Sequence, residues 1–137
     1  MANNVGKALR AAIARRAGGR CEYCLIHDED AGFSHQLDHI VSRKHGGDST
    51  ADNLALSCIA CNRFKGADIA SMSPSGSTVV RLFHPRLDRW ADHFRFDADS
   101  IQALTDIGEA TVRILRFNSK ERVVERSLLR DLGRYPR

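Results

Sequence analysis

The chain has 137 residues, a net charge of +4, 42% hydrophobic and 28% charged residues, which indicates a globular protein and excludes a disordered one. No apolar run approaches the roughly 18 residues that a transmembrane helix needs, and residues 1–20 lack the apolar stretch of a secretory signal. We therefore expect a cytoplasmic protein without membrane association, whose four cysteines bind metal rather than form disulfides.

The basic residues are concentrated at the two ends of the chain. Residues 1–20 hold five Lys or Arg and no acid, and residues 113–137 hold eight basic residues against three acidic ones. Residues 21–112 carry a net charge of −6. Two basic ends around an acidic centre suggest a polyanionic partner held between them. Charge alone slightly favours the alternative, a pair of helices whose basic faces are simply solvated.

The first half of the chain predicts a helix, two strands and a second helix. Apolar residues at every fourth position predict a helix over residues 4–17, capped by Asn3 or Asn4 and ended by Gly18-Gly19. The remaining elements are strands over residues 33–41 and 54–57, a polar loop with Gly46-Gly47 between them, and a helix over residues 62–70.

The second half predicts further strands and two helices after a Ser/Pro/Gly linker. The expected segments are a linker at 72–77, strands at 78–83 and 90–96, a helix at 105–117 capped by Thr105, and a last helix that starts with a capping box of Asn118 and Glu121. This order predicts an α+β fold.

The last helix predicts an exposed arginine stripe. Arg122, Arg126 and Arg130 recur at every fourth position and therefore share one face. We expect the apolar pairs Val123-Val124 and Leu128-Leu129 to face inward. The three arginines are then candidates for contact with the phosphate backbone of DNA.

Two C-x2-C pairs, Cys21/Cys24 and Cys58/Cys61, are separated by 33 residues. Two such pairs complete a tetrahedral all-sulfur shell, which suits a structural zinc ion and leaves no open coordination position. A redox C-x-x-C pair and unrelated buried thiols are the alternatives. Because redox chemistry needs only one pair, two pairs that frame one segment favour zinc.

Residues 21–69 contain a series of short motifs in a fixed order. These are C-x2-C, Asp38-His39-Ile40, Gly46-Gly47, Asp52-Asn53-Leu54, and C-x2-C followed by Asn62 and by Lys65-Gly66. In this the chain resembles the HNH endonuclease family, whose catalytic unit is the ββα-metal fold. The region around Phe83-His84-Pro85-Arg86, Trp90 and His93-Phe94 is similar to the C-terminal part of some small stand-alone bacterial members.

The resemblance implies a role for each polar residue of the motifs. It makes His39 the general base, and it makes Asp38 and Asn62 the ligands of a catalytic divalent cation. Asn53 would order the loop and orient the base. The residue types agree with these roles, since histidine titrates near neutrality and oxygen ligands suit Mg²⁺ or Mn²⁺. Asp38 and His39 would also fit an ordinary polar pair at a strand end.

Asp38 and His39 are neighbours, so a regular strand would point them to opposite faces. Both must reach one phosphate, and we therefore expect a bulge or a strand end near His39. Several basic residues near these motifs are candidate contacts to the DNA backbone, with solvated charges as the alternative. These residues are Arg43, Lys44, His45, Arg63 and Lys65.

Together these features predict an N-terminal basic helix (1–20), an HNH ββα-metal core with a structural zinc (21–71), a linker (72–77) and a small C-terminal α/β extension (78–137), all in one compact domain. The predicted function is metal-dependent cleavage of DNA, most simply double-stranded, by a chain that can act as a homodimer. The alternatives are a zinc-stabilised nucleic-acid-binding module without catalysis and, more remotely, a thiol oxidoreductase.

Overall fold

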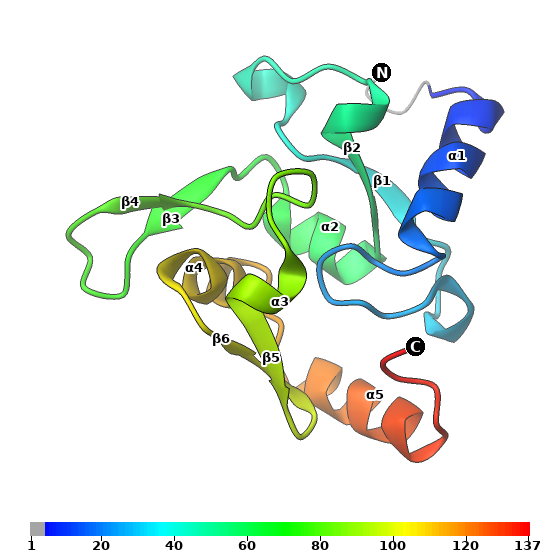
Figure 1. Cartoon of the computed structure of the whole chain (residues 1–137), viewed down its shortest axis with the longest axis vertical. Coiled ribbons are helices and arrows are strands. Elements are labelled where there is room, and N and C mark those ends of the chain that lie inside the picture. The colour runs from blue at the N-terminus through cyan, green and yellow to red at the C-terminus, as the bar shows by residue number, and fades with distance from the viewer. Residues whose placement is uncertain (1–4) are drawn as a thin grey trace.

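The computed structural model describes residues 5–137, so the caps expected at Asn3 or Asn4 lie outside the described residues. Mixed helices and small two-stranded sheets confirm the predicted α+β fold (Figure 1). The elements in chain order are α1 (Lys7–Ala17), β1 (Gln36–His39), β2 (Leu54–Ser57), α2 (Ile59–Lys65), β3 (Ala70–Met72), β4 (Val79–Arg81), α3 (Trp90–His93), β5 (Phe94–Asp97), β6 (Ser100–Ala103), α4 (Asp106–Ile114) and α5 (Lys120–Asp131).

The strands β1 and β2 pair antiparallel and are followed directly by α2, which packs against β1 (Figure 1). Every residue of β2 is buried, because Leu54 and Leu56 pack against α1 and Ala55 lies in the main apolar core. In the register of the pair, Asp38 lies opposite Ala55 and His39 opposite Leu54. This β1–β2–α2 unit is the predicted ββα core.

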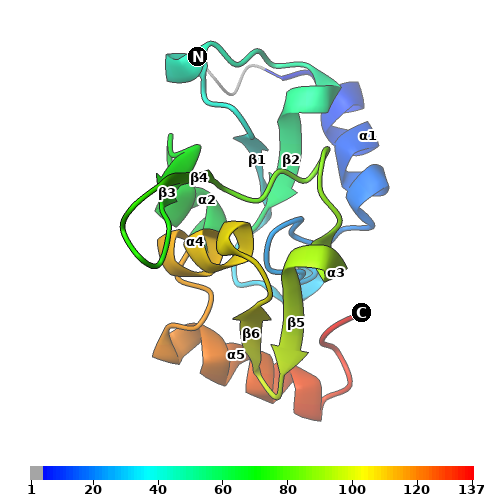
Figure 2. The ribbon, with the colours of Figure 1, turned by 60° about the vertical axis from the view of Figure 1, so that its left-hand side comes forward.

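Helix α1 lies beside the β1–β2 pair in both views (Figures 1 and 2). Its buried residues Ile13 and Ala17 form a small cluster with Leu54 and Leu56 of β2. The helix ends where predicted, because Gly18 adopts a left-handed conformation with a φ of 64°. The packing of α1 on β2 fixes its basic surface next to the ββα core.

Two predicted elements of this core have different limits in the structure. The strand expected at 33–41 is only β1, and Phe33 is exposed. Its end at His39 confirms the expected strand end. Helix α2 begins at Ile59 rather than at residue 62, because Cys58 is its N-cap and the Cys58 sulfur accepts a hydrogen bond from the Cys61 amide.

The second half of the chain contains two hairpins and two helices. Residues 72–77 extend from the end of β3 into the turn that joins it to β4, where the Ser73 amide donates to the Thr78 carbonyl. The strand expected at 90–96 is wrong in its first half, which forms the short helix α3. The predicted Thr105 cap is confirmed, since its hydroxyl accepts from the Gly108 amide at 3.0 Å.

The prediction for the last helix is wrong in two respects. Asn118 does not cap α5; its side chain forms two hydrogen bonds with the Ile101 backbone of β6. The helix is also rotated relative to the expected orientation. Arg122 and Arg126 are only 8% and 3% exposed. Val124 and Leu128 are 50% and 61% exposed.

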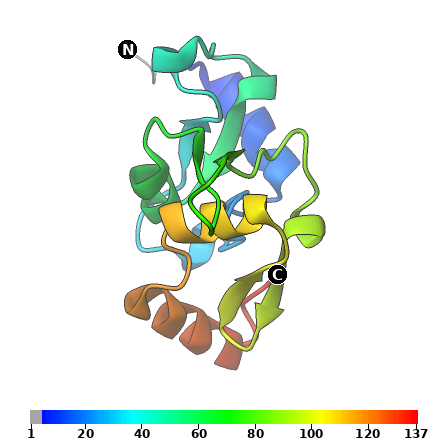
Figure 3. The ribbon, with the colours of Figure 1, turned by 90° about the vertical axis from the view of Figure 1, so that its left-hand side faces the viewer.

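One apolar core joins the two halves of the chain. It includes all four cysteines together with the aromatic residues Phe83, Phe94 and Phe117 from the second half. Helix α4 crosses the middle of the molecule, with the ββα unit on one side and α5 on the other (Figure 3). Among the described residues, no helix has the length and apolar character needed to cross a membrane.

Candidate active site and zinc centre

The four cysteines form a buried cluster in which all four sulfurs lie within 4.8 Å of one another. The Cys24 and Cys58 sulfurs are 3.7 Å apart. That separation is far longer than the roughly 2.05 Å of a disulfide. It matches the roughly 3.8 Å expected between sulfurs in a tetrahedron with Zn–S bonds of about 2.3 Å. The donor set therefore fits a closed, structural zinc ion rather than a redox pair.

Arg122 of α5 extends into this cluster. Its guanidinium donates to the Cys61 sulfur at 3.0 Å and to the Leu115 carbonyl at 2.7 Å. Burial opposes the charged guanidinium, but the neighbouring thiols raise the pKa of Arg122 above its usual value. Zn²⁺ with four thiolates carries a net charge of about −2, so Arg122 neutralises part of a buried negative charge. This role explains why the predicted exposure of Arg122 is wrong.

We expect Arg122→Leu to lower the stability of the protein by about 3–5 kcal/mol, because it leaves a buried charge without its partner. Chelators should also remove zinc faster from the variant. Arg130→Gln on the same helix is a matched control, because Arg130 is exposed and its loss should cost about 0.5 kcal/mol or less. Equal unfolding midpoints and zinc-release rates for the parent and Arg122→Leu would contradict this role.

The predicted base His39 and the predicted cation ligands Asp38 and Asn62 line one cavity at the end of β1, whereas Asn53 is not part of its lining. The cavity has a volume of about 260 Å³. It is lined by Leu37, Asp38, His39, Ser42, Arg43, Asn62, Gly66 and Ala67. Thus β1 supplies Asp38 and His39, α2 supplies Asn62, and the turn after β1 supplies Arg43. The structure brings these four side chains together around one space.

His39 is held by the loop that follows β1. Its Nε2 lies 2.9 Å from the Ser49 hydroxyl, which also accepts a hydrogen bond from Arg43. Its Nδ1 has no hydrogen-bond partner among the described residues. Burial, together with the charges of Arg43 and Lys65, lowers the pKa of His39. The neutral ring, which can accept a proton, therefore predominates at neutral pH.

Asp38 is only 3% exposed and interacts with two residues that the sequence did not associate with it. The Tyr23 hydroxyl donates to one carboxylate oxygen at 2.6 Å, and the Lys65 ammonium lies 3.1 Å from the same oxygen. Lys65 also donates to the His39 carbonyl at 3.0 Å. Desolvation raises the pKa of Asp38, although the Lys65 charge opposes this. Lys65 is buried, so its predicted contact with the DNA backbone is wrong.

Asn53 ties together the loop between β1 and β2. Its side-chain amide donates to the carbonyls of Val41 and Asp48, and its oxygen accepts from the Val41 amide at 2.9 Å. Gly47 passes so close to this point that a Cβ atom would lie 1.7 Å from the Val41 carbonyl oxygen. These contacts are the ones expected of a residue that orders the loop carrying Ser49.

Asn62 lies across the cavity from β1. Its side-chain nitrogen donates to the Gln36 oxygen at 2.5 Å, which leaves the Asn62 oxygen without a partner among the described residues. One carboxylate and one amide oxygen on a shared cavity fit a hard divalent cation that takes its other ligands from water and phosphate. Gln36 is not among the predicted site residues, although the two-residue period of a strand places it on the same face as Asp38.

The remaining predicted DNA contacts fall into two groups. Arg43, Lys44 and His45 form one exposed turn beside the cavity, and Arg63 is exposed on α2. Arg126 is buried, where it donates to the Asp99 carbonyl at 2.7 Å, so its predicted contact with DNA is wrong, like that of Arg122. Arg130 on α5 is exposed but pairs with Asp99 of the turn between β5 and β6. Helix α5 lies at the opposite end of the molecule from β1 (Figure 2).

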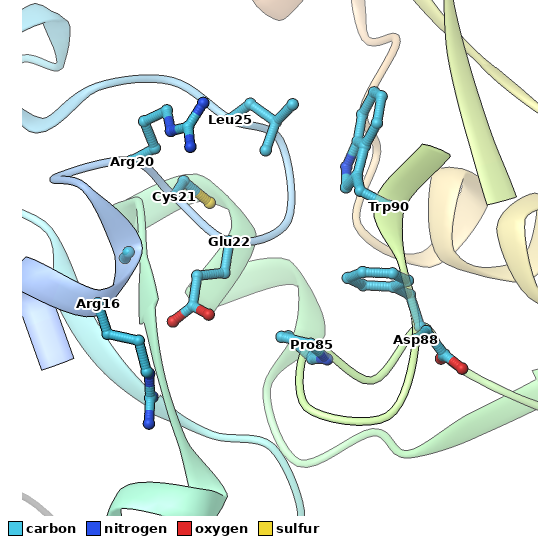
Figure 4. Close-up of a pocket in the computed structure, with 10 residues that line it drawn as sticks. Arg16, Arg20, Cys21, Glu22, Leu25, Pro85, Asp88 and Trp90 are labelled. Atoms are coloured by element: carbon cyan, nitrogen blue, oxygen red, sulfur yellow. The ribbon is translucent and has the colours of Figure 1, made fainter. Parts of the chain in front are cut away.

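A separate cavity of about 200 Å³ lies between the end of α1, the first cysteine pair and the loop before α3 (Figure 4). Its two acids already have partners. Glu22 pairs with Arg86 and accepts from the Leu56 amide. Hydrogen bonds from Arg81 lower the pKa of Asp88 to about 2. We therefore assign these groups a structural role.

Comparisons with known proteins agree with the geometry of the ββα core. Residues 21–68 match the family model described as HNH endonuclease, a range that contains both cysteine pairs and the cavity-lining residues Asp38, His39 and Asn62. No curated protein and no solved structure matches the chain. Residues 21–68, which contain the four-cysteine cluster and the ββα core of this protein, are thus similar to the HNH endonuclease family.

Proposed function

We propose that this protein is an endonuclease that hydrolyses phosphodiester bonds in double-stranded DNA with the help of Mg²⁺ or Mn²⁺. The observation that supports the proposal most directly is the shared cavity of Asp38, His39 and Asn62 within the family segment. A pure binding module has no need for a histidine, a carboxylate and an amide around one space. The four-sulfur zinc centre supplies stability and takes no part in the reaction.

In the proposed reaction, His39 acts as the general base. Its Nδ1 takes a proton from a water molecule that attacks the phosphorus, and Ser49 holds the ring by accepting a hydrogen bond from Nε2–H. A divalent cation bound by Asp38 and Asn62 would act as a Lewis acid on the phosphate and stabilise the leaving O3′. Asn53 keeps the loop of Ser49 in place, so the base is oriented before the substrate arrives.

A zinc-stabilised nucleic-acid-binding module is the second candidate. It is favoured by the surroundings of Asp38, whose carboxylate is already satisfied by Tyr23 and Lys65 without a cation. In that case the exposed turn of Arg43, Lys44 and His45 would bind the phosphate backbone and no bond would be broken. The two candidates differ in one observable, which is the appearance of cut DNA.

Incubation of the purified protein with supercoiled plasmid and Mg²⁺ or Mn²⁺ tests the proposal. We expect conversion to open circles or linear DNA, and no conversion without added metal. The control omits metal instead of adding a chelator, because a chelator would also extract the structural zinc. Plasmid that is bound but never cut with either metal would favour the binding module over the endonuclease.

The form of the product also tests the proposed assembly. One active site per chain cuts one strand, so a monomer should release open circles first, whereas a homodimer that places two sites on one duplex should release linear DNA early. Light scattering at the same concentration would measure the number of chains. The cytoplasmic location expected from the reduced cysteines stays a prediction.

A further inference from the structure

A second cavity continues the active-site cavity toward α1. It has a volume of about 180 Å³ and is lined by Arg10, Gln36, Leu37 and Asn62. Leu37 and Asn62 line both cavities, so the two spaces adjoin along β1 and α2. A nucleic-acid strand that occupies the active-site cavity and continues past Asn62 would enter this second cavity.

Arg10 gives this second cavity a positive charge that no nearby acid cancels. The cavity has no acidic residue in its lining, and Arg10 forms no ion pair with the described residues. Its neighbours on α1 differ in this respect. Arg16 donates to the backbone carbonyls of Ala51 and Leu54 and therefore holds α1 to the core. Arg10 is exposed and remains available for an anion.

The other polar groups of the cavity are suited to a phosphate. The Gln36 oxygen accepts from Asn62, which leaves the Gln36 amide nitrogen to donate. The position of Arg10 is fixed by packing, because Leu9 and Ile13 of α1 and Leu37 of β1 belong to one apolar cluster. A guanidinium and an amide N–H on a rigid support are the groups that commonly contact phosphate oxygens.

We propose that this second cavity, which we call the Arg10 subsite, binds the phosphodiester next to the one that is cut. The proposal rests on the proposed function, since it assigns the neighbouring phosphate of the same nucleic-acid strand. Arg10 pairs with the non-bridging oxygens of that phosphate, and Gln36 donates to it. The protein should therefore prefer a strand that extends beyond the scissile bond on this side over an isolated phosphodiester.

The test compares Arg10→Gln with the matched control Arg15→Gln, which removes an exposed arginine from the same helix but not from the subsite. DNA binding is measured at several salt concentrations in the His39→Ala background, so it does not depend on cleavage. We expect Arg10→Gln to weaken binding by about tenfold, as for one lost hydrogen bond to a charged group. Its log–log salt slope should fall by about 0.9. Arg15→Gln should change both quantities much less.

A second measurement separates the subsite from the reaction itself. Bis(p-nitrophenyl) phosphate is a diester without a neighbouring phosphate, so Arg10→Gln should lose more kcat/KM on DNA than on this compound. Equal losses on both substrates, equal effects of Arg10→Gln and Arg15→Gln, or an unchanged affinity and salt slope would each overturn the subsite. A parent protein that binds DNA with Arg10-dependent affinity but cleaves neither substrate would instead overturn the endonuclease and leave the phosphate contact standing.

Discussion

Replacing His39 with alanine should reduce the rate of DNA cleavage by about 10²–10⁴-fold while DNA binding is retained. The reason is that His39 is the group in the cavity with a free ring nitrogen and a neutral form at neutral pH. A general base acts in the chemical step, so the loss should be seen in the single-turnover rate at saturating DNA and not in the affinity. Gel assays of plasmid cleavage and titrations with labelled duplex measure the two quantities separately.

Ser49→Ala is the matched variant for this experiment. It removes the hydroxyl next to Nε2 but leaves the imidazole, so its rate should lie between those of the parent and His39→Ala. The ring would then have lost one hydrogen bond, worth about 0.5–1.5 kcal/mol. A His39→Ala protein that keeps the parental single-turnover rate would exclude His39 as the base.

Replacing Cys61 with serine should abolish zinc binding and stable folding together. Structural zinc sites of this kind contribute about 10–16 kcal/mol, which is as large as the whole unfolding free energy of an ordinary domain, about 5–15 kcal/mol. Cys61 is fully buried, and its sulfur also accepts the hydrogen bond from Arg122. Elemental analysis should find one zinc per parent chain and none in the variant, whose circular dichroism should be that of an unfolded chain.

The parent protein provides a second route to the same answer if the variant cannot be purified. A strong chelator should unfold the parent, and added zinc should restore the fold. The result would contradict a structural zinc if the parent folds without zinc and its four thiols react with a thiol reagent in the native state. Four reactive thiols per chain would also exclude a disulfide, because each disulfide consumes two thiols.

The four-cysteine cluster and the shared cavity of Asp38, His39 and Asn62 could be predicted because their signals are local in sequence. The spacing of Cys21, Cys24, Cys58 and Cys61 leaves few chemical alternatives, and the structure brings the four sulfurs together. The strand end at His39 followed from the need to aim two neighbouring side chains at one phosphate. The Thr105 cap followed from a side chain that commonly begins helices.

The orientation of α5 could not be predicted, because its apolar residues occur in adjacent pairs that lie on two faces of a helix. The structure places Leu129 against the core and leaves Leu128 exposed. The rotation is decided by acceptors outside the helix, namely the Cys61 sulfur, the Leu115 carbonyl and the Asp99 carbonyl. Arg122 and Arg126 donate hydrogen bonds to these acceptors. The sequence of the helix alone does not indicate that such acceptors are present.

The same long-range effect explains Lys65. In sequence it lies beside Asn62, on a helix expected to face DNA, but the fold turns its ammonium onto Asp38 and the His39 carbonyl. Asn118 was assigned to a cap because it precedes a helix, whereas the backbone of β6 offers it two hydrogen bonds. In each case the polar side chain binds a partner that is distant in sequence instead of a local one.

Residues 21–68 share their apolar core with the rest of the chain, which limits their transfer to another protein as an independent unit. Half of the buried residues in the core that contains the cysteines come from outside residues 21–68, among them Phe83, Phe94 and Phe117. The chain also closes over its own metal centre, since the Tyr135 hydroxyl donates to the Cys24 carbonyl. Grafted onto another scaffold, the segment would expose one side of the thiolates to water and to competing ligands. A host would have to supply both an aromatic cover and a buried cation for the four thiolates.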